Sequence, residues 1–134
     1  MNLKQQWTRA EAAAVTGLVA SAAGIGVLWA SGIAFPVYPP PGIILMLTGA
    51  VLFTVLRTRR RWASLLPLAF GLFIQIGFVV EGLISGRGFA NVAGDAGTGA
   101  MIGQIVQQLG AITAIIGGVI ATRARFGRTS QRTV

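Results

Sequence analysis

The sequence predicts an all-α membrane protein in which four transmembrane helices form one compact bundle of 134 residues. Three observations lead to this fold class. Hydrophobic residues make up 54% of the chain and charged residues only 10%, whereas a soluble domain carries roughly 25% charged residues. The apolar residues fall into four long runs, and the positive charges lie mainly at alternate ends of those runs.

Each apolar run predicts one helix, and together the four make a single domain. We expect helices at about residues 12–35, 41–57, 63–84 and 99–122. A helix needs about 20 apolar residues to cross a bilayer, and all but the second run reach that length. The second begins at Pro41, which suits a first helical position because its missing N–H has no intrahelical partner there. We expect it to span as well, either with the Arg57 side chain reaching outward to the membrane surface or with local thinning of the bilayer.

The positive residues predict which way the helices cross. Ten lie at one side of the expected membrane, namely Lys4, Arg9, Arg57, Arg59, Arg60, Arg61, Arg123, Arg125, Arg128 and Arg132. Only Arg87 lies on the other side. Since arginine and lysine stay in the cytoplasm when loops are short, we expect both termini there, with residues 123–134 as a basic tail. Arginine outnumbers lysine ten to one, a bias that we associate with GC-rich bacterial genomes, so the expected location is a bacterial inner membrane.

The arginine clusters also predict the partners of the chain. Basic residues beside a membrane span attract anionic lipid headgroups, and the candidates for this contact are Arg57, Arg59, Arg60, Arg61, Arg123 and Arg125. A nucleic-acid patch is the alternative reading of such a cluster. The orientation rule alone accounts for every cluster, so no nucleic-acid partner is expected.

Small residues at helical spacing predict where the helices meet. In lipid, helices associate through close backbone approach at small residues and through interhelical hydrogen bonds. The candidates for such packing positions are Gly17, Ser21, Gly24, Gly71, Gly110, Ala114 and Gly118. The segment of residues 85–100 is rich in glycine and small polar residues, and we expect it to be a loop.

Polar residues inside the expected spans give the candidate site. Glu81 is the only ionisable residue well within a span, because Glu11 precedes the first one. The glutamines that could share a pocket with Glu81 are Gln75, Gln104, Gln107 and Gln108. Intramembrane carboxylates are candidates for ion or proton binding. The other interpretation is that these side chains only join helices by hydrogen bonds.

The residue types argue against catalysis and cofactors. The chain has no histidine and no cysteine, so the commonest metal ligands and general bases are missing, and no metal or cofactor site is expected. We therefore expect a non-catalytic membrane protein, either an accessory or assembly subunit of a larger complex or a homo-oligomeric scaffold. The alternative is a small transporter or channel in which Glu81 binds a proton or cation.

Overall fold

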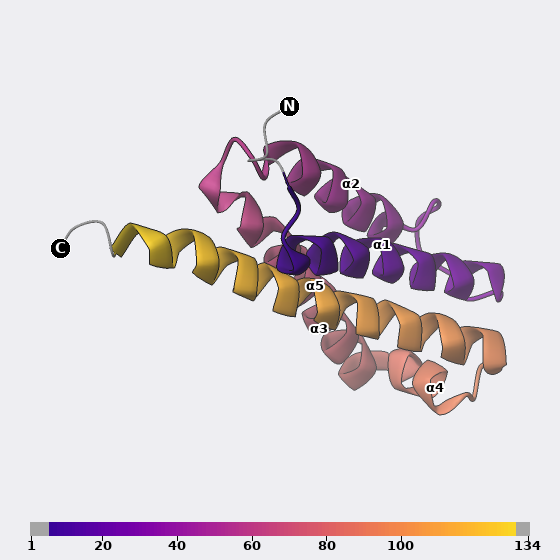
Figure 1. Cartoon of the computed structure of the whole chain (residues 1–134). Coiled ribbons are helices and arrows are strands. Elements are labelled where there is room, and N and C mark those ends of the chain that lie inside the picture. Colours follow the sequence, from indigo (N-terminus) through magenta and orange to yellow (C-terminus); the bar gives the residue numbers. More distant parts are fainter. Residues whose placement is uncertain (1–5, 131–134) are drawn as a thin grey trace.

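The computed structural model describes residues 6–130, and this part of the chain is helical throughout, apart from short connections (Figure 1). In chain order the elements are α1 (Arg9–Ala30), α2 (Pro41–Leu56), the 3-10 helix η2 (Arg61–Ser64), α3 (Leu65–Ser85), α4 (Arg87–Ala93) and α5 (Thr98–Ser130). The predicted all-α class is confirmed for these residues.

Three helical segments of the described chain are long and apolar enough to cross a membrane. They are α1 with 22 residues, the continuous η2–α3 segment Arg61–Ser85 with 25, and α5 over Thr98–Arg128 with 31. Helix α2 is apolar but has only 16 residues. By length and composition, these helices are those of a membrane-embedded protein.

The first helix begins earlier than the hydropathy pattern predicts, because a capping box starts it. The Glu11 N–H donates to Thr8 Oγ1 at 3.1 Å, and the Thr8 N–H donates to Glu11 Oε2 at 3.1 Å. This reciprocal pair satisfies backbone donors that a helix start leaves without partners. The expectation that Glu11 precedes the helix is therefore wrong: Glu11 is buried in its first turn.

The predicted loop at residues 85–100 contains a short helix. Gly86, with φ 75°, ends α3, and Gly94, with φ 87°, ends α4. Both angles are left-handed, and glycine adopts them without steric cost. These two glycines thus end helices, and the segment between them is helical, although the sequence predicts a loop.

The predicted basic tail also differs, because α5 continues without a break through residues 123–130. Figure 1 shows α5 extending beyond the other helices at the end of the bundle where α1 begins. We call this end of the bundle the arginine end, and the opposite one the α4 end. Lys4 and Arg132, which contribute to the predicted charge bias, lie outside the described residues.

An antiparallel seam between α1 and α5 is the most extensive helix contact in the described chain. A Cβ atom placed on Gly17 would lie 2.4 Å from the Ala114 nitrogen, and one on Gly24 would lie 2.3 Å from the Gln107 nitrogen. On the facing helix, a Cβ on Gly110 would lie 2.4 Å from the Ser21 nitrogen. No real side chain fits at such distances, so the two backbones touch directly, as small residues allow in membrane helices.

The other helices pack on this seam through further small residues. Gly71 of α3 faces the Ala111 carbonyl of α5, and Gly118 of α5 faces the Leu68 backbone of α3. The packing candidates are all buried, namely Gly17, Ser21, Gly24, Gly71, Gly110, Ala114 and Gly118. The opposite face of α5 is exposed, including Ile102, Ile105, Leu109, Ile112, Ile116 and Ile120. Along α5, small and polar side chains thus face the interior, and aliphatic ones face outward.

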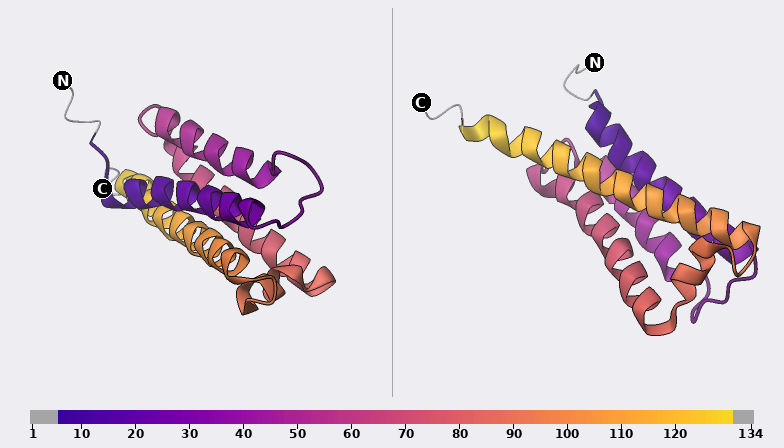
Figure 2. Two further views of the ribbon diagram at one scale, coloured as in Figure 1. Left: turned by 90° about the vertical axis from the view of Figure 1, so that its right-hand side faces the viewer. Right: turned by 90° about the horizontal axis from the view of Figure 1, so that it is seen from below.

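Helix α3 leaves the bundle gradually toward its C-terminal end. Figure 2 shows α3 diverging from α5 in this direction, with α4 bridging the widening gap. The ring of Phe89 from α4 packs against Gly82 and meets Phe78 edge-on at 5.4 Å between ring centroids. The bundle is therefore tight along α1 and α5 but open on the side of α3 at the α4 end.

Candidate functional site

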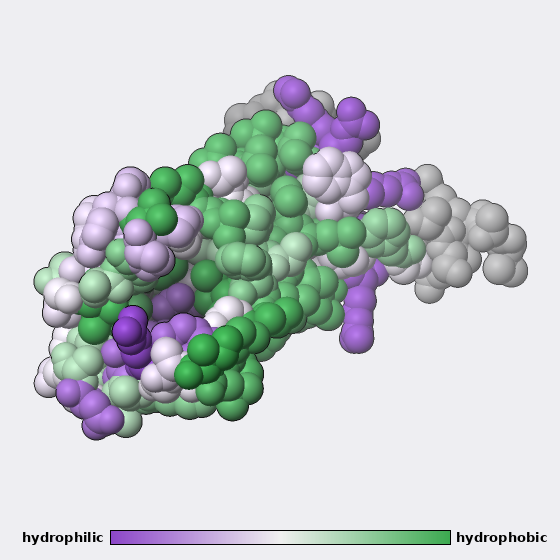
Figure 3. All heavy atoms as spheres, turned by 180° about the vertical axis from the view of Figure 1, so that it is seen from behind, coloured by the Kyte–Doolittle hydropathy of each residue, from purple (hydrophilic) through white to green (hydrophobic). Residues whose placement is uncertain are grey.

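A hollow of about 600 Å³, lined by apolar and polar side chains together, opens at the α4 end, where α3 diverges from the other helices. Its walls come from the last turn of α1, the loop after it, α3, α4 and α5. Figure 3 shows hydrophilic side chains inside a hollow at the end away from the termini, with hydrophobic surface between this end and the other. This hollow is the candidate site at the α4 end.

Three of the five predicted site residues line this hollow, namely Glu81, Gln104 and Gln107. Arg87 and Asn91 of α4 complete its polar lining. Gln104 and Asn91 are buried, with 5% and 7% of their surface exposed. A chain of amides joins them: Asn91 Nδ2 donates to Gln104 Oε1 at 3.4 Å, and Gln104 Nε2 donates to Gln107 Oε1 at 3.0 Å. Because each amide both donates and accepts, the chain fixes the orientation of the polar wall.

Glu81 is exposed at the rim of the hollow instead of being enclosed in it. Its Oε2 accepts the Gly88 N–H at 2.8 Å, and its Oε1 accepts the Ser85 hydroxyl. Both partners are within seven residues in the sequence: Ser85 is the last residue of α3, and Gly88 lies in the first turn of α4. The carboxylate therefore fastens α4 onto α3.

The two remaining predicted residues lie elsewhere in the bundle. Gln75 of α3 donates from Nε2 to the backbone carbonyl of Gln108 in α5 at 3.3 Å, which is an interhelical bond. The side-chain amide of Gln108 is buried, and within residues 6–130 it has no hydrogen-bond partner; the same holds for the Ser21 hydroxyl. Neither glutamine is among the residues that line the hollow.

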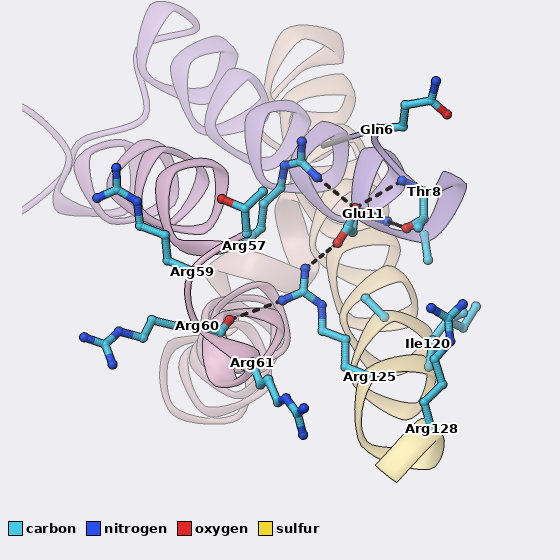
Figure 4. A pocket seen from close by; sticks show the side chains of 14 residues that line it. Gln6, Thr8, Glu11, Arg57, Arg59, Arg60, Arg61, Ile120, Arg125 and Arg128 are labelled. Atoms are coloured by element: carbon cyan, nitrogen blue, oxygen red, sulfur yellow. Dashed lines mark hydrogen bonds and ion pairs between the residues drawn. The ribbon is translucent and has the colours of Figure 1, made fainter. Parts of the chain in front are cut away.

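At the arginine end, the buried carboxylate of Glu11 joins three parts of the chain. Arg57, at the end of α2, places Nη1 3.2 Å from Glu11 Oε2. Arg125 of α5 pairs with Glu11 Oε1 through Nη2, while its Nη1 donates to the Arg60 carbonyl at 3.2 Å. Figure 4 shows the two guanidinium groups reaching Glu11 from different helices. One carboxylate thus links α1, the turn between α2 and η2, and α5.

Trp7 covers one side of this ion pair. The Arg57 guanidinium carbon lies 4.0 Å from the centroid of the Trp7 ring, which is a cation–π distance. The same ring meets Phe53 of α2 edge-on, with 6.3 Å between centroids. Arg57 is consequently only 9% exposed. The sequence predicts that the Arg57 side chain reaches outward, whereas Glu11 and Trp7 hold its charge inside the bundle.

A second hollow, which we call the arginine basin, surrounds the Glu11 cluster. It measures about 880 Å³, and six arginines but only one carboxylate line it. Among the predicted headgroup contacts, Arg59, Arg60 and Arg61 are exposed and line the basin. Arg57 and Arg125 also line it, but both pair with Glu11. Arg123 is exposed and lies outside the lining.

Sequence reasoning passed over Glu11, although the sequence contains a signal for it. The segment Thr8-Arg9-Ala10-Glu11 has the spacing of a capping box, which marks a helix start ahead of an apolar run. A hydropathy pattern places charged residues outside a span, so it does not predict that a glutamate paired with two arginines lies within the first helix. Gly103 and Gly117 were missed in a similar way: with Gly110 they form a seven-residue repeat that faces α1.

The arrangement offers no metal centre among the described residues, since no three acidic, histidine or cysteine side chains gather within residues 6–130. Comparison with known proteins gives no relative, because no family model, curated protein or solved structure matches the chain. The two hollows are therefore interpreted from their own geometry.

Proposed function

We propose that this chain is a four-span integral membrane protein of a bacterial plasma membrane, with α2 as the fourth span. The arginine end and both termini face the cytoplasm, and the α4 end faces outward. The charge distribution supports this orientation: the arginines at the arginine end include Arg9, Arg57, Arg61 and Arg125, whereas Arg87 is at the α4 end. Arginine and lysine residues beside the spans usually stay in the cytoplasm and so determine the orientation of a membrane protein.

Within the membrane, the protein acts without catalysis as an accessory or assembly subunit, or as a homo-oligomeric scaffold. The observation that carries this proposal is that polar side chains of the bundle form hydrogen bonds between helices. Gln75 bonds the backbone of α5, and Gln104 joins α4 to α5, while Glu81 at the rim bonds Gly88 of α4. Together with the glycine seam, these bonds make a fixed body, which suits a part that other membrane proteins assemble on.

Purification from native membranes in mild detergent, followed by native mass spectrometry, tests the proposal. We expect the tagged protein to appear as a defined oligomer or with a stoichiometric partner. Gly110→Leu should abolish that assembly, because any side chain at Gly110 collides with the Ser21 backbone. Gly26→Leu is the matched control, since nothing lies within 4 Å of a Cβ at Gly26. A wild-type protein that is monomeric and has no partner would contradict the proposal.

A second candidate function is supported by the polar side chains in the lining of the hollow at the α4 end. Glu81, Gln104 and Gln107 face a common space there, and such groups can bind a proton or cation on its way across a membrane. On this account, reconstituted protein mediates ion flux that depends on pH, and Glu81→Gln removes the dependence. Flux that is absent, or unchanged in Glu81→Gln, would exclude the transport function.

A further inference from the structure

The buried polar wall of the hollow at the α4 end consists of amides. Its buried members, Asn91 and Gln104, and the half-buried Gln107 all carry amide side chains. The two charged residues of the lining, Glu81 and Arg87, are exposed. Glu81 already accepts hydrogen bonds at both of its carboxylate oxygens. The inner part of the hollow therefore offers hydrogen bonds from uncharged groups.

The amide chain leaves one donor and one acceptor for a further partner. Asn91 uses Nδ2 toward Gln104, and Gln107 uses Oε1 toward Gln104. Within residues 6–130, the other two polar atoms, Asn91 Oδ1 and Gln107 Nε2, form no hydrogen bond. Both residues line the hollow, and neither atom is enclosed by protein, so a ligand can reach them. Because a polar group without a partner is costly at a buried position such as Asn91, this wall favours a ligand that supplies a matching donor and acceptor.

The facing walls of the hollow are apolar and include aromatic rings. Helix α3 contributes Phe73 and Phe78, and the loop after α1 contributes Phe35 and Pro36. Aromatic rings pack favourably on one another in offset or edge-on arrangements. The volume of about 600 Å³ lies within the range of roughly 300–1,000 Å³ that is usual for small-molecule sites. An aromatic molecule with a polar group would contact both kinds of wall at once.

Gly77 keeps space open in the α3 wall. The α3 residues of the lining recur at helical spacing over residues 73–81, so they share one face of the helix, with Gly77 near its middle. A Cβ on Gly77 would meet nothing in the described chain within 4 Å. By contrast, a Cβ on Gly71 of the same helix would lie 2.8 Å from the Ala111 carbonyl oxygen. Gly71 thus brings two helices together, whereas the missing side chain at Gly77 enlarges the hollow.

We propose that the hollow at the α4 end binds an uncharged aromatic molecule whose polar group both donates and accepts hydrogen bonds, such as a carboxamide. The ring lies between the apolar walls. The polar group accepts from Gln107 Nε2 and donates to Asn91 Oδ1. This inference goes beyond the proposed assembly function and beyond ion transport. Its test measures ligand binding, and neither copy number nor flux, so it can fail independently of both.

Ligand titration of the purified full-length protein in neutral detergent tests the site, with the melting temperature as the readout. The three probes share a naphthalene ring: naphthamide donates and accepts hydrogen bonds, methyl naphthoate only accepts them, and naphthoate is an anion. The test variant Gly77→Phe places a ring in the hollow. Gly26→Phe is the matched control, because a Cβ at either glycine meets nothing in the described chain within 4 Å and Gly26 lies outside the lining.

We expect naphthamide to raise the melting temperature of the wild-type protein and of Gly26→Phe saturably, but not that of Gly77→Phe. Methyl naphthoate should bind the wild-type protein about fivefold more weakly, since it lacks one hydrogen bond of about 1 kcal/mol net. Asn91→Leu should bind these two probes equally, because it removes the acceptor that distinguishes them. Naphthoate should bind more weakly than naphthamide, because its charge would have to leave water for a wall of uncharged groups.

Three results would overturn the proposal. In the first, naphthamide has no saturable effect on the wild-type protein. In the second, naphthamide binds Gly77→Phe and Gly26→Phe equally well, which would place it outside the hollow. In the third, naphthoate binds more tightly than naphthamide, which would indicate an anion site. Melting without ligand checks that the variants fold, and Gly77→Met with Gly26→Met as its control replaces the first pair if Gly77→Phe does not.

Discussion

Glu11 and Glu81 lie at opposite ends of the bundle and differ in the range of their contacts. Glu11 is buried and pairs with residues 46 and 114 positions away in the sequence. Glu81 is exposed, and its partners are four and seven positions away. The first carboxylate determines how helices meet, whereas the second holds a single turn.

This difference shows why position in a hydropathy profile is a poor guide to the role of a charged residue. Glu81 lies within an apolar run, which makes it the obvious intramembrane carboxylate. Glu11 lies among charged residues at the start of α1, where a profile assigns it to the surface. Its role follows from its ion pairs with Arg57 and Arg125, which come from other parts of the bundle. Because an unpaired buried charge is costly, the buried carboxylate requires these partners.

The largest effect is expected from removing the buried carboxylate. Glu11→Ala removes the carboxylate that two guanidinium groups share, and loss of one member of a buried ion pair costs about 3 kcal/mol or more. Unfolding in mixed micelles with increasing denaturing detergent measures this loss. Glu81→Ala is the matched control and should cost clearly less. An equal loss in the two variants would remove the distinction between the two ends.

A smaller effect is expected in the seam that connects the two ends. A Cβ on Gly24 would lie 2.3 Å from the Gln107 backbone nitrogen, so Gly24→Ala must separate α1 from α5, at about 2 kcal/mol for such overpacking. Gly26→Ala meets no atom within 4 Å and should be neutral or slightly stabilising, since alanine favours a helix over glycine. The same unfolding assay compares them, and a Gly24→Ala protein as stable as Gly26→Ala would refute the backbone contact.

The smallest effect is expected from Glu81→Gln. The amide retains an oxygen that can accept the Gly88 N–H, so the loss should be about 1 kcal/mol or less. It should also be local: hydrogen–deuterium exchange should increase in residues 86–94 and stay unchanged at the arginine end. Faster exchange around Arg57 in this variant would contradict the local role of Glu81.

The sequence predicts the features of the fold that depend on composition and spacing. The four apolar helices follow from hydropathy, and the interior face of α5 follows from the recurrence of Gln104, Ala111, Ala114 and Gly118 at helical spacing. Small and polar residues that recur at helical spacing lie on one face of the helix, and that face tolerates close packing. Helix α4 escapes prediction because glycines at its ends read as loop residues, although Gly86 and Gly94 mark helix ends.

The candidate sites depend on contacts between distant segments, so the sequence predicts them less completely. Three polar residues of the hollow come together as the helical spacing suggests, whereas Gln75 and Gln108 lie elsewhere because they occupy another face of their helices. The Glu11 cluster requires residues from α1, α2 and α5 to meet at one end. Only the direction and register of the packed helices decide that, and neither is encoded in any one segment.

Cysteine labelling tests the proposed orientation most directly, because the chain contains no cysteine of its own. Thr58→Cys places a thiol on the exposed turn at the arginine end, and Ala96→Cys places one on the exposed connection between α4 and α5. In intact spheroplasts, a membrane-impermeant maleimide should label the protein with Ala96→Cys and leave the protein with Thr58→Cys unlabelled until the cells are lysed. Labelling of Thr58→Cys in intact spheroplasts, with Ala96→Cys protected, would contradict the account.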